Sequence, residues 1–104
     1  MNNLKELNNV KEVLNKLIGE PNELGKFIKL EELRYAFATT WCIEHPNVED
    51  RMQVYRDFGY LLYQICIDKI PFDKLRDKSS KEYLDWLLMK NKIIYLPILI
   101  TDNS

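Results

Sequence analysis

The sequence predicts an all-α fold: a four-helix, mostly antiparallel bundle with an extended apolar C-terminal strap. Hydrophobic residues recur at steps of three and four along most of the chain, which is the period of a helix with one buried face. Glycine and proline are scarce, with three and four copies in 104 residues, and this scarcity favours long elements over many short strands. The length fits one domain, so we expect residues 1–104 to form a single helical domain.

The first predicted helix covers residues 3–18. Its apolar residues lie on one side and its charged and amide residues on the other, so the helix is amphipathic. Gly19 followed by Pro21 is a usual stop signal at the end of a helix. The apolar side consists of Leu4, Leu7, Val10, Val13, Leu14, Leu17 and Ile18.

The second predicted helix has its main body at residues 29–44, after a short turn at residues 22–25. Pro46 ends this helix, because the residue before a proline is displaced from helical backbone angles. One apolar stripe runs along the helix and predicts its buried side. The stripe consists of Leu30, Leu33, Phe37 and Trp41.

The third predicted helix, residues 48–68, is expected to be the central one. Asn47 is a suitable N-cap, and Asp50 lies in the first turn, where the helix dipole favours a negative charge. Two apolar stripes together cover roughly 200° of its circumference, so this helix should contact two or more neighbours. Gly59 predicts a close approach by another backbone, since glycine otherwise destabilises a helix. The stripes are Val48, Met52, Tyr55, Gly59, Leu62 and Cys66, and Val54, Phe58, Leu61 and Ile65.

The last predicted helix begins near Ser79, which forms a capping-box pattern with Glu82, and continues to about residue 91. A loop or a single helical turn at residues 71–78 precedes it. Residues 93–100 are rich in β-branched side chains and contain a proline, so they should be extended. They form either a strap over their own bundle or a strand that pairs with another chain. The side chains that the last helix should bury are Tyr83, Leu84, Leu87 and Leu88.

Charge and composition limit the classes of partner. The formal net charge is −1, from 15 basic and 16 acidic residues. Nucleic-acid binding relies on clustered Lys and Arg, and docking on an anionic membrane needs a similar excess, so we expect neither. The longest apolar stretch has eight residues, against about twenty for a spanning helix, and the N-terminus has no signal-peptide pattern. We therefore expect a cytoplasmic protein.

The sequence offers no catalytic constellation, so we expect neither an enzyme nor a metal or other cofactor. Cys42 and Cys66 lack the spacing of redox or zinc motifs and are expected to be buried, free thiols. In a helical hairpin they would lie about 24 Å apart, too far for a disulfide. The enzymatic alternative is a metal- or thiol-dependent site at Cys42, His45 and Glu49, although such chemistry needs an orienting third group.

One line of residues on the third helix is unusual for a solvent-facing side. The side opposite the two apolar stripes should be polar, yet Arg56, Tyr60, Tyr63 and Ile67 follow one another there at steps of four, three and four. Tyr and Arg are enriched in binding hot spots because they combine a large area with a polar tip. These four residues are our candidate partner-binding site. The alternative is that the bundle encircles the helix and buries them.

The resulting functional hypothesis is a small non-catalytic protein-binding module, of the inhibitor, immunity, antitoxin or adaptor type, that occludes the surface of a partner protein. The alternative is a structural subunit of a homo-oligomer, such as a homodimer formed through the third helix or the C-terminal segment. Both follow from missing catalytic groups and from apolar residues at positions where a monomer needs polar ones.

Overall fold

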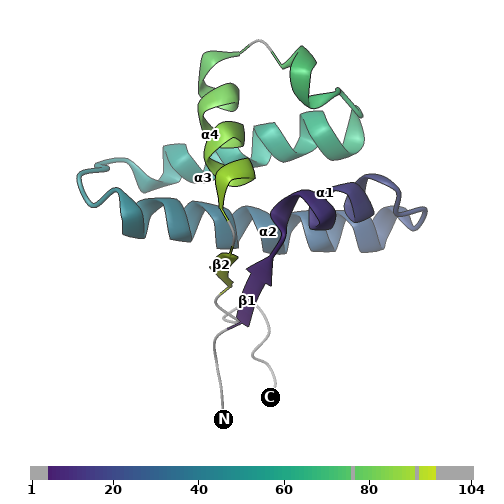
Figure 1. The fold of residues 1–104 in the computed structure, drawn as a ribbon, viewed down its shortest axis with the longest axis horizontal. Coiled ribbons are helices and arrows are strands. Elements are labelled where there is room, and N and C mark those ends of the chain that lie inside the picture. Colours follow the sequence, from purple (N-terminus) through teal and green to yellow (C-terminus); the bar gives the residue numbers. More distant parts are fainter. Residues whose placement is uncertain (1–4, 76, 91, 96–104) are drawn as a thin grey trace.

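The computed structural model describes residues 5–75, 77–90 and 92–95. Four α-helices form the body of this part of the chain, which confirms the predicted all-α, mostly antiparallel four-helix architecture (Figure 1). A π-helix continues the third α-helix, and a 3-10 helix precedes the fourth, where a loop or a single helical turn was expected. The elements are β1 (Lys5–Asn8), α1 (Val10–Ile18), α2 (Glu23–Glu44), α3 (Arg51–Leu62), the π-helix (Tyr63–Ile67), the 3-10 helix (Phe72–Lys74), α4 (Lys78–Met89) and β2 (Lys92–Tyr95).

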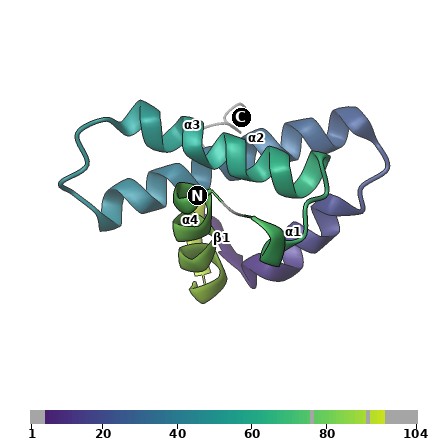
Figure 2. The same ribbon diagram turned by 90° about the horizontal axis from the view of Figure 1, so that it is seen from above.

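The helices form two layers. α2 and α3 lie side by side and antiparallel as a long hairpin. α1 and α4 both lie on one side of this hairpin, which is the nearer side in Figure 1 and the lower side in Figure 2. α1 runs antiparallel to the first half of α2, whereas α4 crosses the hairpin steeply. We call the side that α1 and α4 cover the inner face, and the opposite side of the hairpin the outer face.

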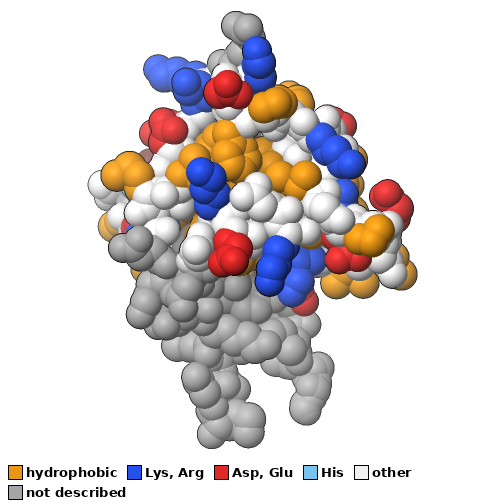
Figure 3. Space-filling view, turned by 45° about the vertical axis from the view of Figure 1, so that its right-hand side comes forward, with side chains coloured by type: hydrophobic (Ala, Val, Ile, Leu, Met, Phe, Trp, Pro, Cys, Tyr) orange, Lys and Arg blue, Asp and Glu red, His pale blue; other side chains and the backbone are white. Residues whose placement is uncertain are grey.

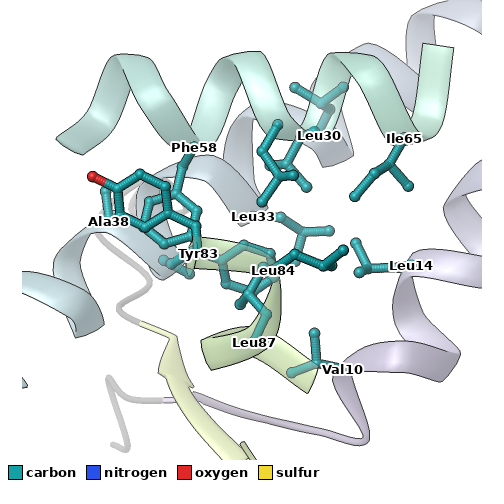
Figure 4. Packing of buried hydrophobic residues seen from close by; sticks show 14 of the residues in the cluster. Val10, Leu14, Leu30, Leu33, Ala38, Phe58, Ile65, Tyr83, Leu84 and Leu87 are labelled. Carbon is teal, nitrogen blue, oxygen red and sulfur yellow. The ribbon is translucent and has the colours of Figure 1, made fainter. Parts of the chain in front are cut away.

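The core fills the space between the two layers (Figure 4). Leu14 enters it from α1, Leu30 and Leu33 from α2, Phe58 from α3 and Leu87 from α4, and all five are buried. Most of the residues that the helical period assigned to the core are buried in the same way. The spacing of the hydrophobic residues therefore predicted correctly which side of the hairpin faces the core.

Residues 5–8 form a strand and not the start of the first helix, so the predicted extent of that helix, residues 3–18, is wrong. The residues of β1 instead pair with β2 in antiparallel register, with Lys5 opposite Tyr95. The extended conformation predicted for residues 93–100 is confirmed for residues 93–95, and residues 96–100 lie outside the described residues. The spacing of the apolar residues near the N-terminus cannot show that a strand from the other end of the chain will pair with this segment. The pairing with β2 overrides the helical pattern of the sequence.

Asparagine side chains start the first two helices. Asn9 has a left-handed backbone conformation with φ of 56°, which asparagine tolerates better than most residues, and its side chain accepts a hydrogen bond from the Glu12 N–H at 3.3 Å. Asn22 accepts from the Gly25 N–H at 2.9 Å and caps α2. α2 therefore begins directly after Asn22, and the turn expected at residues 22–25 is the first turn of this helix.

The caps of the other two helices differ from those predicted. Asp50, and not Asn47, caps α3 by accepting a backbone N–H at 3.0 Å. Asp77, and not Ser79, caps α4 by accepting one at 3.1 Å. Each region holds several residues that can cap a helix, and the path of the incoming loop selects among them. α4 ends at Met89, and Leu88, predicted to be buried, is exposed.

A buried lysine joins three helix ends. Lys26, in the first turns of α2, is almost completely buried. Its ammonium group donates hydrogen bonds to the carbonyl oxygens of Ile18, the last residue of α1, at 3.3 Å and of Cys66, in the π-helix, at 3.2 Å. Carbonyl groups at the carboxyl ends of helices carry partial negative charge. The ammonium group of Lys26 therefore neutralises two such ends and fixes where α2 lies between them.

Arg34 of α2 occupies the space beside Gly59 of α3. Its Nε donates a hydrogen bond to the Tyr55 carbonyl oxygen at 3.0 Å, and its guanidinium lies 4.0 Å from the centre of the Tyr55 ring. The guanidinium also pairs with Glu31 at 3.3 Å. A Cβ at residue 59 would lie only 2.4 Å from Arg34 Nε. The predicted close approach at Gly59 is present, but the approaching group is a side chain and not a backbone.

The end of α2 is tied to the end of α4. The Trp86 indole N–H donates a hydrogen bond to the Glu44 carboxylate at 3.0 Å, and Lys90 forms an ion pair with the same carboxylate. Partial burial raises the pKa of Glu44, but the hydrogen bonds from Lys90 and Trp86 outweigh it and hold this pKa below its ordinary value. The Trp86 ring also packs edge-on against Trp41, with ring centres 5.1 Å apart. These contacts set where α4 crosses the hairpin.

We predict that Gly59→Ala lowers the free energy of unfolding by about 1 kcal/mol, although alanine is the better helix former by a similar amount. The added methyl group displaces Arg34 from the Tyr55 carbonyl, and a hydrogen bond from a charged group contributes roughly 1.5–3 kcal/mol. In an Arg34→Ala background, the same substitution should instead raise stability by roughly 0.5–1 kcal/mol. Urea denaturation of the four proteins measures this cycle, and effects of the same sign in both backgrounds would contradict the account.

Candidate docking surface on the outer face

The outer face of the hairpin has no described element packed against it (Figures 1 and 2). Two contacts show which parts of its helices are neighbours: Lys26 reaches Cys66, and Arg34 reaches Tyr55. The first turns of α2 therefore lie beside the π-helix, and the middle of α2 lies beside Tyr55 in α3. A hollow that residues near the end of α2 and the start of α3 line together places these two ends beside each other. A face without a covering element should be polar unless it binds something.

All four predicted binding residues are exposed. The exposed fraction is 59% for Tyr60, 41% for Tyr63 and 37% for Ile67, and that of the Arg56 side chain is 56%. The hydroxyl groups of Tyr60 and Tyr63 have no hydrogen-bond partner among the described residues. The four residues are therefore not part of the core, and the alternative in which the bundle encircles them is wrong.

Two of the four residues lie in the π-helix, which the sequence did not predict. Tyr63 and Ile67 are its first and last residues, and the Asp68 N–H donates a hydrogen bond to the Tyr63 carbonyl oxygen at 3.0 Å. Lys69 then takes a left-handed conformation with φ of 56°, which ends the helix. π-helical turns are rare and frequently occur at functional sites. The unusual backbone therefore coincides with the predicted binding residues.

Arg56 is held in place by neighbouring side chains. Its guanidinium donates a hydrogen bond to Gln53 at 3.2 Å and lies 4.0 Å from the Asp50 carboxylate. Gln53 in turn donates to Asp57 at 2.7 Å, and Asp57 accepts a hydrogen bond from the Tyr83 hydroxyl of α4 at 3.0 Å. Partial burial and the Asp57 carboxylate raise the pKa of the Tyr83 hydroxyl, which stays protonated at neutral pH. An arginine oriented in advance loses less entropy when it binds.

The first turns of α2 add three exposed apolar residues that the sequence prediction missed. Leu24, Phe27 and Ile28 are all exposed, and the register of the hairpin places them at the same end as Tyr63 and Ile67. Their spacing of three and four residues is the signal of one helix face. The sequence prediction misses it because it places residues 22–25 in a turn.

A second apolar area lies at the other end of the hairpin. Ile43, 65% exposed, and Met52, 59% exposed, line a hollow of about 430 Å³ between α2 and α3, together with Ala38 and Cys42. Arg51 lines the same hollow. The assignment of Met52 to the core was wrong, because the helical period gives the side of a helix but not whether a neighbour covers it. Met52 lies in the first turn of α3, at the far end of the hairpin from α1.

Exposed apolar side chains are concentrated on the hairpin. Ten large hydrophobic side chains are exposed among residues 9–75, 77, 78 and 80–90, for which the structure describes the side chains, and eight of them belong to α2, α3 and the π-helix. The other two, Leu88 and Met89, lie at the end of α4. Another side of the molecule also carries hydrophobic side chains near its centre, with charged side chains around them (Figure 3). The hairpin nevertheless holds most of the exposed large hydrophobic side chains among these residues.

The residues of the enzymatic alternative are not brought together. His45 stacks on the Trp41 ring, with ring centres 4.0 Å apart, and its Nδ1 lies 2.8 Å from the Trp41 carbonyl oxygen. Cys42 is buried and free, as is Cys66, and Glu49 is exposed. Within residues 5–75, 77–90 and 92–95, no group of three or more His, Cys, Asp or Glu side chains is arranged to hold a metal ion.

Comparison with protein-family models, with curated proteins and with solved structures finds no match. Among the described helices, none combines the length and the hydrophobicity that crossing a bilayer requires. A functional interpretation of this chain therefore rests on the chemistry of its own surface.

The environment of Cys66 predicts an unreactive thiol. Burial raises the pKa of this thiol to about 11, although the nearby Lys26 lowers it slightly, and the thiolate is the reactive form. In a Cys42→Ala variant at about pH 8, iodoacetamide should alkylate Cys66 at least about a hundredfold more slowly than in the same protein unfolded in urea. Mass spectrometry over time measures this ratio, and rapid labelling of the folded variant would contradict the burial described here.

Proposed function

We propose that this chain is a non-catalytic protein-binding module that acts by covering the surface of a partner protein with the outer face of its α2–α3 hairpin. Small inhibitors, immunity proteins, antitoxins and adaptors work in this way. The proposal places the protein in the cytoplasm, where two free cysteines persist without forming disulfides. We do not propose nucleic acid or a membrane as a partner, because binding to either relies on an excess of positive charge and the net charge is −1.

The observation that carries the proposal is the exposed line Arg56, Tyr60, Tyr63 and Ile67 on a face without a described covering element. Large exposed apolar areas on monomeric proteins usually mark interaction sites. Aromatic residues and arginine supply most of the binding free energy in protein interfaces. Leu24, Phe27 and Ile28 of α2 enlarge this area beyond one helix, as a protein-sized interface requires.

The internal contacts of the hairpin support binding without large rearrangement. Lys26 and Arg34 hold α2 against its neighbours through hydrogen bonds to backbone carbonyl groups. Arg56 is oriented by Gln53 and Asp50. A surface that is already in its bound shape avoids the entropy cost of ordering side chains on association.

The test compares two variants in a pull-down from the native host, with the recovered proteins quantified by mass spectrometry. Tyr60→Glu combined with Tyr63→Glu places two charges on the outer face, and we expect it to reduce recovery of the partner by at least about thirtyfold, the effect of losing a hot spot worth 2 kcal/mol. Met89→Glu changes the most exposed apolar residue of α4 and should leave recovery unchanged. Urea denaturation checks that both variants remain folded.

Equal recovery by the folded outer-face variant and the wild type would refute the proposal. Sedimentation of the purified protein separates it from the homo-oligomer alternative. We expect a monomer at the concentrations used for the pull-down. Self-association that is lost in the Tyr60→Glu and Tyr63→Glu variant, but kept in Met89→Glu, would instead assign the outer face to a homodimer.

A further inference from the structure

A groove on a different part of the surface has the size of a ligand site. It lies between α1 and the first half of α2 and has a volume of about 460 Å³. Its apolar lining includes Val13 and Leu17 of α1 and Leu33 of α2, of which Leu17 and Leu33 are buried. Pockets that bind small molecules are mostly apolar, have a few polar groups and span roughly 300–1,000 Å³. None of the four predicted binding residues lines this groove.

Gly25 lines the groove, and the fold does not require a glycine there. Its φ is not positive, and a Cβ at this position would lie 3.5 Å from the nearest atoms, those of the Asn22 side chain, which is an ordinary contact. Gly59 is different, because a Cβ there would meet Arg34. Glycine destabilises a helix relative to almost any other residue. The missing side chain at residue 25 therefore lowers the helix propensity of α2, and its structural effect is to keep the groove open.

Two lysine side chains line the groove, one on each wall. Lys16 belongs to α1 and Lys29 to α2. Lys29 lies 3.5 Å from Glu32, while Lys16 has no charged partner among the described residues. Glu20 also lines the groove, but its carboxylate accepts a hydrogen bond from the Asn22 N–H at 3.0 Å. The amino-terminal end of α2, where this groove begins, adds partial positive charge.

The geometry points to a binding site for a small amphipathic anion, an alkyl carboxylate, in the groove between α1 and α2. The alkyl chain lies along Val13, Leu17 and Leu33, in the space that Gly25 leaves open. The carboxylate lies between Lys16 and Lys29. An apolar lining with two cations at its rim complements this ligand better than a neutral hydrocarbon, which would leave the ammonium group of Lys16 without a charged partner. The groove is separate from the outer face, so the proposed ligand site can be refuted without refuting the proposed partner-binding face, and the reverse also holds.

Titration of the full chain with octanoate, followed by NMR, tests the site. We expect saturable shifts at residues that line the groove in the wild type. Gly25→Leu fills the groove while raising helix propensity, so it should bind octanoate at least about tenfold more weakly and unfold at the same or a higher temperature. Gly19→Ala is the matched control, because a Cβ there lies 3.8 Å from its nearest neighbour and residue 19 does not line the groove.

A second comparison tests the role of charge. Replacing Lys16 and Lys29 by Gln should weaken octanoate binding by several-fold and leave the binding of octanol unchanged. The site is refuted if the wild type shows no saturable shifts at groove residues up to about 10 mM octanoate. It is also refuted if Gly25→Leu binds octanoate as well as Gly19→Ala does. Equal binding of octanoate and octanol by the wild type would overturn the assignment of an anionic ligand.

Discussion

The arrangement of the helices depends on the buried ammonium group of Lys26. It donates hydrogen bonds to the carbonyl groups of Ile18 and Cys66, so one side chain connects the end of α1, the π-helix and the start of α2. A buried charge without partners costs several kcal/mol. Neither α1 nor the π-helix can slide along α2 without breaking one of the two hydrogen bonds of this charge. The contact therefore fixes the register of the hairpin and the position of α1 at the same time.

The surface properties follow from this register. Once α2 and α3 are aligned, Arg34 lies beside Gly59, and α1 and α4 cover the inner face (Figure 2). Apolar residues that point inward make the core, whereas those that point outward, such as Ile28, Met52 and Tyr63, remain exposed. The outer face is apolar because both helices carry apolar residues on more of their circumference than one covered face can bury.

Local patterns in the sequence predicted the helices well and the contacts between distant segments poorly. The end of α2 at Glu44 was predictable, because Pro46 acts on its immediate neighbours. The helical period likewise identified buried residues, but it gives a side of a helix and not its neighbour, so Met52 was placed in the core. The strand β1 and the Arg34 contact at Gly59 depend on partners far away in the sequence. The exposed Tyr60 and Tyr63 were identified because they interrupt a side that should be polar.

The most direct measurement of the central claim is the solvent accessibility of the outer face in the free protein. A soluble paramagnetic agent broadens the NMR signals of methyl groups that it can approach. We predict strong broadening of the Ile28, Ile43 and Met52 methyl signals and almost none for Leu30 and Leu61, which are buried. Protection of the Ile28 and Met52 methyl groups to the same degree as Leu61 would show that something covers this face, and would contradict the account.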